Sequence, residues 1–95
     1  MIKVIAKHFV KEEKVDKVLD LAKDLVEQTL KENGCINYAM YQDQENKKLL
    51  VMVEEWNTKE ALDKHMVSEH FKRIVPQINE LLEKKPEISI LRKVI

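Results

Sequence analysis

Three side chains that could transfer protons lie close together in the second half of the sequence: Glu54, His65 and His70. Imidazole titrates closer to neutral pH than any other unperturbed side chain, which suits it to general acid–base catalysis. A buried carboxylate can act as a base itself or can orient a histidine. We therefore take His65, His70 and Glu54 as the candidate catalytic residues.

Each of these residues also has a structural interpretation. Glu54 is expected on an apolar face of a strand, where a carboxylate is costly unless it has a partner, so an ion pair with a lysine or arginine is the alternative to catalysis. His65 follows Ala61 and Leu62 at helical spacing and should face inward, as a hydrogen-bonded core histidine would. His70 lies in the first turn of the next expected helix. Both interpretations stay open for all three.

Aromatic and apolar side chains could supply a flat wall for an aromatic ring, although core packing explains them equally well. His8 is expected on the same strand face as Val4 and Ala6 and could reach the same cavity. The three histidines and Glu54 are scattered over three elements without the spacing of metal ligands, so no metal site is expected. The candidate substrate-binding residues are Trp56, Phe71, Tyr38, Met40 and His8.

Composition excludes several classes of function. The 95 residues predict a single domain, 1–95, in which 17 basic residues balance 17 acidic ones, so nucleic acid is not an expected partner. Gly34 is the only glycine, which leaves no dinucleotide fingerprint and no phosphate-binding loop. Accordingly, no flavin, nicotinamide or other cofactor is expected.

The single cysteine, Cys35, allows no internal disulfide and indicates a reducing compartment. Without a base beside it, Cys35 is interpreted as a small core residue rather than a nucleophile. No apolar run approaches the ~20 residues that span a bilayer. We expect a cytoplasmic protein with no membrane partner.

Periodicity predicts the elements that must position these residues. Strands are expected at 2–10, 35–42, 49–56 and 88–95, and a long amphipathic helix from 15 should end at Gly34. Asn57 and Glu60 resemble a capping box that opens a short helix to about Met66. Ser68 should cap a further helix whose apolar stripe reaches Leu82, with Pro76 kinking or dividing it. The order β-α-β-β-α-α-β predicts an α+β, ferredoxin-like fold with an antiparallel sheet.

This sheet should be apolar on both faces. Leu49, Val51 and Val53 alternate with Leu50 and Met52 along the third strand, and the last strand is similarly apolar on its two sides. Helices cover only one face in a ferredoxin-like arrangement, so the other face is expected to be an interface. A second copy of the chain, related by a two-fold axis, is the simplest partner. The sequence therefore predicts a homodimer.

The segment EEWNTKEALDKH at 54–65, followed by SEHF at 68–71, resembles the antibiotic biosynthesis monooxygenase family, and ENGCINY at 32–38 resembles that family's entry into its second strand. The resemblance implies that the homodimer is a dimeric α+β barrel. Relatives include cofactor-independent monooxygenases of quinols or polyketide phenols, haem-degrading enzymes, and isomerases of a phosphorylated, sugar-derived signal. The haem-degrading branch uses an Asn, a Trp and a His that fall here on Lys7, His65 and about Val75, so haem degradation is disfavoured.

The resemblance implies a cofactor-free monooxygenase that acts on a small aromatic or quinol substrate and on molecular oxygen. In this hypothesis His65, helped by Glu54 or His70, removes a proton, and the substrate anion passes an electron directly to oxygen. Two alternatives remain: an isomerase of a small phosphorylated signal molecule, and a non-catalytic dimer that binds a small molecule.

Overall fold

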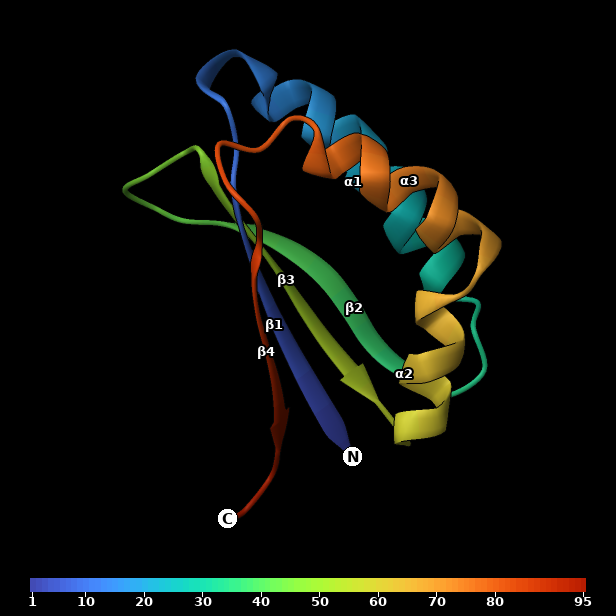
Figure 1. Ribbon diagram of the computed structural model, residues 1–95. Helices are drawn as coiled ribbons and strands as arrows, with labels where there is room; N and C mark the ends of the chain where they lie inside the picture. The colour runs from blue at the N-terminus through green and yellow to red at the C-terminus, as the bar shows by residue number, and fades with distance from the viewer.

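The computed structural model describes residues 1–95 and has the predicted α+β architecture (Figure 1). Four strands and three helices follow the predicted order, with one additional short 3-10 turn after the first strand. The elements are β1 (Ile2–Phe9), η1 (Glu12–Lys14), α1 (Val15–Thr29), β2 (Cys35–Gln42), β3 (Leu49–Trp56), α2 (Lys59–Met66), α3 (Glu69–Asn79) and β4 (Glu87–Arg92).

The four strands form one antiparallel sheet in the order β2-β3-β1-β4, which is the ferredoxin-like topology. The helices lie on one side of this sheet, and α1 and α3 run next to each other across it (Figure 1). Residues two apart on a strand share a face, so Val4 and Ala6 of β1 point to the same side as Leu50 and Met52 of β3. All four are buried beneath the helices.

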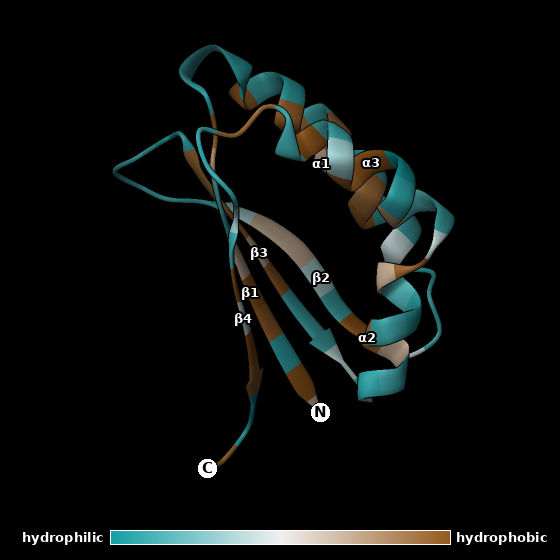
Figure 2. Ribbon diagram, in the orientation of Figure 1, coloured by the Kyte–Doolittle hydropathy of each residue, from teal (hydrophilic) through white to brown (hydrophobic).

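The hydrophobic core fills the space between this face of the sheet and the helices. Trp56, Leu50 and Ile74 are its largest fully buried apolar side chains. Burial alternates along β3, where Leu50, Met52, Glu54 and Trp56 are buried and the residues between them are only half-buried. Hydrophobic residues also mark β1 and β4 outside the part of the sheet that the helices cover (Figure 2). The alternation along β3 confirms that the helices cover one face of the sheet and leave the other uncovered.

Helix α1 ends earlier than predicted. Its last helical residue is Thr29, and the N–H groups of Lys31 and Glu32 donate to carbonyls three residues back, which tightens the chain into a turn. Gly34 does adopt the expected left-handed conformation, with φ of 88°. It lies inside this turn rather than next to the helix end, and a Cβ there would be 2.6 Å from the Cβ of Ala61.

The cap of α2 also differs from the prediction. The Thr58 hydroxyl accepts from the Ala61 N–H at 3.1 Å and is the N-cap, whereas the backbone N–H of Asn57 donates to the Gly34 carbonyl. Asn57 therefore ties α2 to the turn before β2 and does not open a capping box.

Helix α3 has the predicted Ser68 cap, whose hydroxyl accepts from the Phe71 N–H. Pro76 does not divide α3. It has no N–H to donate, so one backbone hydrogen bond is missing near the C-terminal end of the helix. The Glu80 N–H still donates to the Pro76 carbonyl, which keeps the last turn in place. The helix stops at Asn79, so Leu82 lies beyond it and pairs with Val10 in an isolated β-bridge. No helix of the protein has the length and apolar character needed to span a bilayer.

Candidate functional site

A cavity of about 250 Å³ lies between the helix-covered face of the sheet, the helices α1 and α3, and the start of β4. Nine of its twelve lining residues are hydrophobic, which suits an apolar or aromatic ligand. Four of the five predicted substrate-binding residues line it, namely His8, Tyr38, Met40 and Phe71. The fifth, Trp56, is fully buried outside the cavity wall.

His8 is the histidine at this cavity. Its Nδ1 lies 3.2 Å from the carbonyl oxygen of Leu50, and because a carbonyl can only accept, Nδ1 carries the hydrogen. Nε2 then keeps its lone pair. Burial lowers the pKa of His8, outweighing the hydrogen bond to Leu50, so the neutral form is favoured near neutral pH. A neutral imidazole with a free lone pair can accept a proton from a ligand.

His65 faces inward from α2, as its spacing predicted, and is only 1% exposed. Its ring lies among those of Trp56, Phe71 and Tyr38, with centroids 4.7, 5.1 and 5.2 Å away. Tyr38 and Phe71 line the cavity, whereas His65, which packs against both rings, does not. Burial lowers the pKa of His65, and Glu32 acts in the opposite direction.

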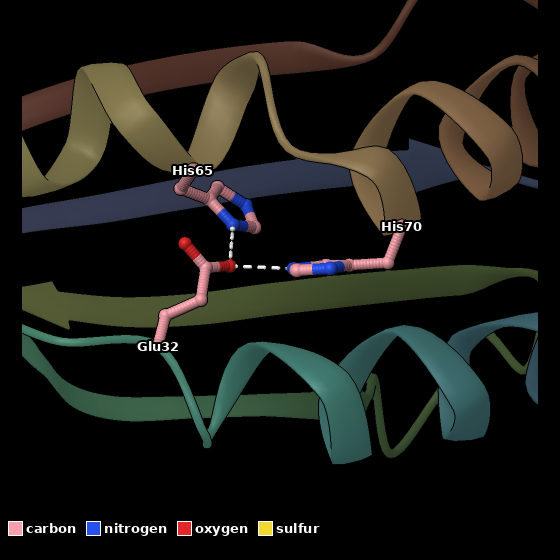
Figure 3. A group of neighbouring side chains, drawn as sticks. All are labelled: Glu32, His65 and His70. Atoms are coloured by element: carbon pink, nitrogen blue, oxygen red, sulfur yellow. Dashed lines mark hydrogen bonds and ion pairs between the residues drawn. The ribbon is translucent and has the colours of Figure 1, made fainter.

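Glu32 brings His65 and His70 together (Figure 3). Its Oε2 lies 2.7 Å from Nδ1 of His65 and 2.6 Å from Nε2 of His70, so both imidazoles donate to one carboxylate oxygen. The break between α2 and α3 allows this, because Ser68 both caps α3 and donates its hydroxyl to the His65 carbonyl at 2.7 Å. We call Glu32, His65 and His70 the Glu32 cluster.

Sequence reasoning missed Glu32. It weighed the three histidines together with Glu54 as possible metal ligands, and the structure instead gathers His65 and His70 around Glu32 and leaves His8 at the cavity. One ligand atom from each member of the Glu32 cluster lies within 4.8 Å of the others, a set that could hold a metal ion. Periodicity predicts Glu32 at the end of the helix that runs to Gly34, and nothing in that pattern distinguishes it from its neighbours.

Glu54 is buried, as its position on β3 predicted. It pairs with neither a lysine or arginine nor a histidine, the partners that the sequence suggested. Its Oε1 accepts from the indole Nε1–H of Trp56 at 2.9 Å, and no lysine or arginine pairs with it. The predicted ion pair is therefore wrong, and the carboxylate that orients histidines is Glu32. Burial raises the pKa of Glu54 to about 7, the indole hydrogen bond opposes this, and the charge of Glu32 adds to it.

Cys35 is half-buried and packs against the core at the start of β2. Burial, followed by the charges of Glu32 and Glu54, raises the pKa of its thiol to about 11. The reactive form of cysteine is the thiolate, which is disfavoured here. This environment agrees with the structural role inferred for Cys35.

Comparisons with known proteins agree with this fold. The family model described as "Antibiotic biosynthesis monooxygenase" matches residues 1–77. A crystal structure of a conserved protein from Methanosarcina mazei is 50% identical, covers 98% of this chain and 92% of its own, and has a TM-score of 0.96. A crystal structure described as an antibiotic biosynthesis monooxygenase is 40% identical, covers 100% of both chains, and has a TM-score of 0.95.

One curated protein, described as an uncharacterized protein of Synechocystis, is 31% identical over 83 residues. The match covers 87% of this chain and 56% of the Synechocystis protein, so the chain spans about half the length of the curated relative it matches.

Proposed function

Because this chain belongs to the antibiotic biosynthesis monooxygenase family, we propose that it is a monooxygenase that oxidises a single-ring phenol or quinol. The observation that carries this proposal is the apolar cavity with one histidine in its wall. Substrate would bind between the sheet and the helices, against the rings of Tyr38 and Phe71.

The size and lining of the cavity support a small, uncharged aromatic substrate. Its volume of about 250 Å³ is below the roughly 300–1,000 Å³ of pockets for drug-sized ligands, which favours a single ring over a polycyclic one. No lysine or arginine lines it. A phosphorylated substrate would leave its charge without a partner, so the lining does not favour the isomerase alternative.

His8 is the proposed proton acceptor. The hydroxyl proton of the substrate passes to Nε2 of His8, whose hydrogen on Nδ1 is held by the Leu50 carbonyl. We prefer His8 to His65 for this role because His8 lines the cavity, whereas His65 is fully buried and does not line it. Trp56 and Glu54, joined by their hydrogen bond, would support the wall from within the core.

Removal of the proton makes the ring electron-rich enough to transfer one electron to O₂. Recombination of the two radicals then forms a C–O bond on the ring. His8 returns its proton to the outer oxygen of the resulting peroxide. Loss of the ring C–H proton and cleavage of the O–O bond then release that oxygen as water and leave a quinone or hydroxyquinone. The substrate supplies all the electrons, so atoms and charge balance without an external reductant. An apolar cavity protects the intermediates from water.

The proposed functional unit is a homodimer, formed through the face of the sheet that the helices leave uncovered. Tyr41 is 57% exposed and Leu91 47% exposed on this face, and Ile88 and Ile90 of β4 are about equally exposed beyond the edge of the helices. Apolar surface of this kind on a small protein usually marks an interface. A second copy would cover it and close the barrel.

Oxygen consumption tests the proposed activity. Tag-free, metal-stripped protein is incubated with a panel of single-ring quinols and phenols in ¹⁸O₂, and the products are analysed by mass spectrometry. We expect O₂ uptake with one labelled oxygen atom in the product. Isomerisation of a sugar phosphate without O₂ uptake, or tight ligand binding without turnover, would overturn the proposal.

Two variants locate the base. His8→Gln should lower turnover by roughly 10²–10⁴-fold, the usual contribution of a general base. His65→Gln keeps a side chain of similar polarity outside the cavity and should lose less. A larger loss in His65→Gln than in His8→Gln would assign the base to His65 instead.

A further inference from the structure

We propose that the Glu32 cluster is a binding site for one divalent transition-metal cation of the Zn²⁺ class. This inference goes beyond the proposed function, which draws its electrons from the substrate and uses His8. None of the cluster's three residues lines the cavity, and His65 packs against the rings of Tyr38 and Phe71, which do.

The ligand set is the first argument. Two imidazole nitrogens and one carboxylate oxygen are the protein ligands of many catalytic zinc sites, and the same combination holds iron(II) in a facial arrangement. Atoms bound at ~2.0–2.2 Å to one metal ion stand roughly 3–3.5 Å from each other. The pairs at 2.6 and 2.7 Å would therefore separate by less than about 1 Å to admit an ion.

The second argument is that three separate elements hold the ligands in place. Glu32 lies in the turn after α1, where its N–H donates to the Thr29 carbonyl and its own carbonyl accepts from the Cys35 N–H. His65 is fixed in the core from α2. His70 lies in the first turn of α3, whose start is capped by Ser68. Such prior positioning reduces the entropic cost of binding an ion.

The charge of Glu32 is the third argument. No lysine or arginine pairs with this carboxylate, and its only side-chain partners are the two imidazoles. The side chains of Glu32 and His70 are each 15% exposed whereas that of His65 is 1% exposed. A cation can therefore enter from the Glu32 and His70 side, where room for a water or another exogenous ligand would remain.

The buried Nε2 of His65 is an independent observation. This atom has no hydrogen-bond partner although the residue is almost fully enclosed. Ligation through Nδ1 places the remaining hydrogen on Nε2, where the surrounding aromatic rings can accept it weakly. Without a metal, donation of the Nδ1 hydrogen to Glu32 leaves a bare lone pair on Nε2 in an apolar environment, which is unfavourable.

Direct metal binding tests the site in the unmodified chain. Tag-free, metal-stripped protein is titrated with Zn²⁺ by calorimetry and with Co²⁺ by visible absorption, and crystals soaked in Zn²⁺ are examined for anomalous scattering. We expect one ion per chain, Co²⁺ d–d bands, and an anomalous peak between Glu32, His65 and His70. Absence of binding at millimolar metal, or a peak elsewhere, would overturn the proposal.

Variants connect the binding to these residues. Glu32→Gln and His70→Ala should each weaken Zn²⁺ binding by at least ~10–100-fold, the loss seen even for indirect partners of a metal. His8→Ala removes the one histidine outside the cluster and should leave the affinity unchanged. Equal binding in all three variants would refute the site, and their circular dichroism spectra verify that each is folded.

The outcome is separable from that of the proposed function. Turnover by the metal-stripped protein supports the monooxygenase whether or not the ion binds. A protein that binds Zn²⁺ through the Glu32 cluster but never consumes O₂ would retain the metal site and lose the proposed activity.

Discussion

Burial has a larger effect on the protonation of Glu54 than any neighbouring residue, and this links its ionisation to folding. The unfolded chain releases this proton near the ordinary glutamate value, whereas the native state holds it until about pH 7. Between these two values the native state binds more protons than the unfolded state, so rising pH reduces the stability of the fold. The cost is at most ~3 kcal/mol at 1.36 kcal/mol per pKa unit.

Glu54→Gln should remove this dependence. Glutamine keeps an oxygen that accepts from the Trp56 indole and has no proton to lose. Relative to the wild type, the variant should gain ~2–3 kcal/mol of stability between about pH 5 and about pH 8, measured by urea unfolding at both. Glu55→Gln makes the same chemical change on the other face of β3 and is the control. An equal gain in both variants would mean that burial of Glu54 is not the cause.

The proposed base gives a second pH-dependent prediction. Because burial lowers the pKa of His8, this residue should stay neutral below the usual histidine value. The acidic limb of kcat/KM should therefore have its midpoint below ~6.5, the ordinary histidine pKa. His8→Gln should abolish that limb in addition to lowering the rate. A midpoint above the ordinary value would contradict a buried, neutral His8.

Local spacing in the sequence predicts the positions of some of these side chains and not of others. Ala61, Leu62 and His65 share a helix face whatever surrounds them, so the inward position of His65 could be predicted. The contact between Glu32 and the histidines spans more than thirty residues and depends on a turn, which sequence periodicity does not describe. Glu32 could not have been identified without the fold.

At the scale of the elements, Gly34 joins the turn after α1 to α2. Gly34→Ala should destabilise the fold because alanine pays ~1–2 kcal/mol for a left-handed conformation and its Cβ would meet that of Ala61 at 2.6 Å. Ala61→Gly removes the clash but not the conformational cost. Urea unfolding should therefore show a smaller penalty for Gly34→Ala in the Ala61→Gly background. Equal penalties in the two backgrounds would show that the turn shifts to avoid the clash.

At the start of α2, Asn57 and Thr58 are both possible N-cap residues by sequence, and the structure shows that Thr58 is the cap. Thr58→Ala should cost ~0.5–2 kcal/mol, the usual value of a lost N-cap, because the Ala61 N–H loses its acceptor. Asn57→Ala should cost less, since Asn57 contributes its backbone N–H to the Gly34 carbonyl and alanine keeps that group. Thermal unfolding of the two variants is the comparison. A larger loss for Asn57→Ala would restore the capping box.

The order and type of the elements followed from the sequence, as did the bounds of β2 and β3, whereas the ends of α1, α3 and β4 differ from the prediction. The apolar stripe of α1 continues to Leu30 in the sequence, so nothing in it indicated that the chain would tighten at Thr29. In the same way, Leu82 continued the period of α3 but is buried by its pairing with Val10. The end of α1 is therefore set by hydrogen bonds within a local turn, and the position of Leu82 by a long-range pairing, and the apolar period describes neither.

At the scale of the whole molecule, the uncovered face of the sheet leaves the apolar side chains of Tyr41 and Leu91 exposed. Val53 lies near its centre, between Ile5 and Ala39 on the neighbouring strands, and is only half-buried. A copy packed against this face would enclose Val53 in an apolar interface. A charge placed there would then be buried without a partner, at a cost that association could not offset.

The proposed homodimer therefore predicts that Val53→Asp shifts the protein from dimer to monomer in sedimentation equilibrium while the helix-covered core keeps its circular dichroism spectrum. Lys72→Asp introduces the same side chain on the exposed outer surface of α3 and should leave the dimer intact. A wild type that sediments as a monomer, or a Val53→Asp variant that remains dimeric, would mean that the uncovered face is not where the chains meet.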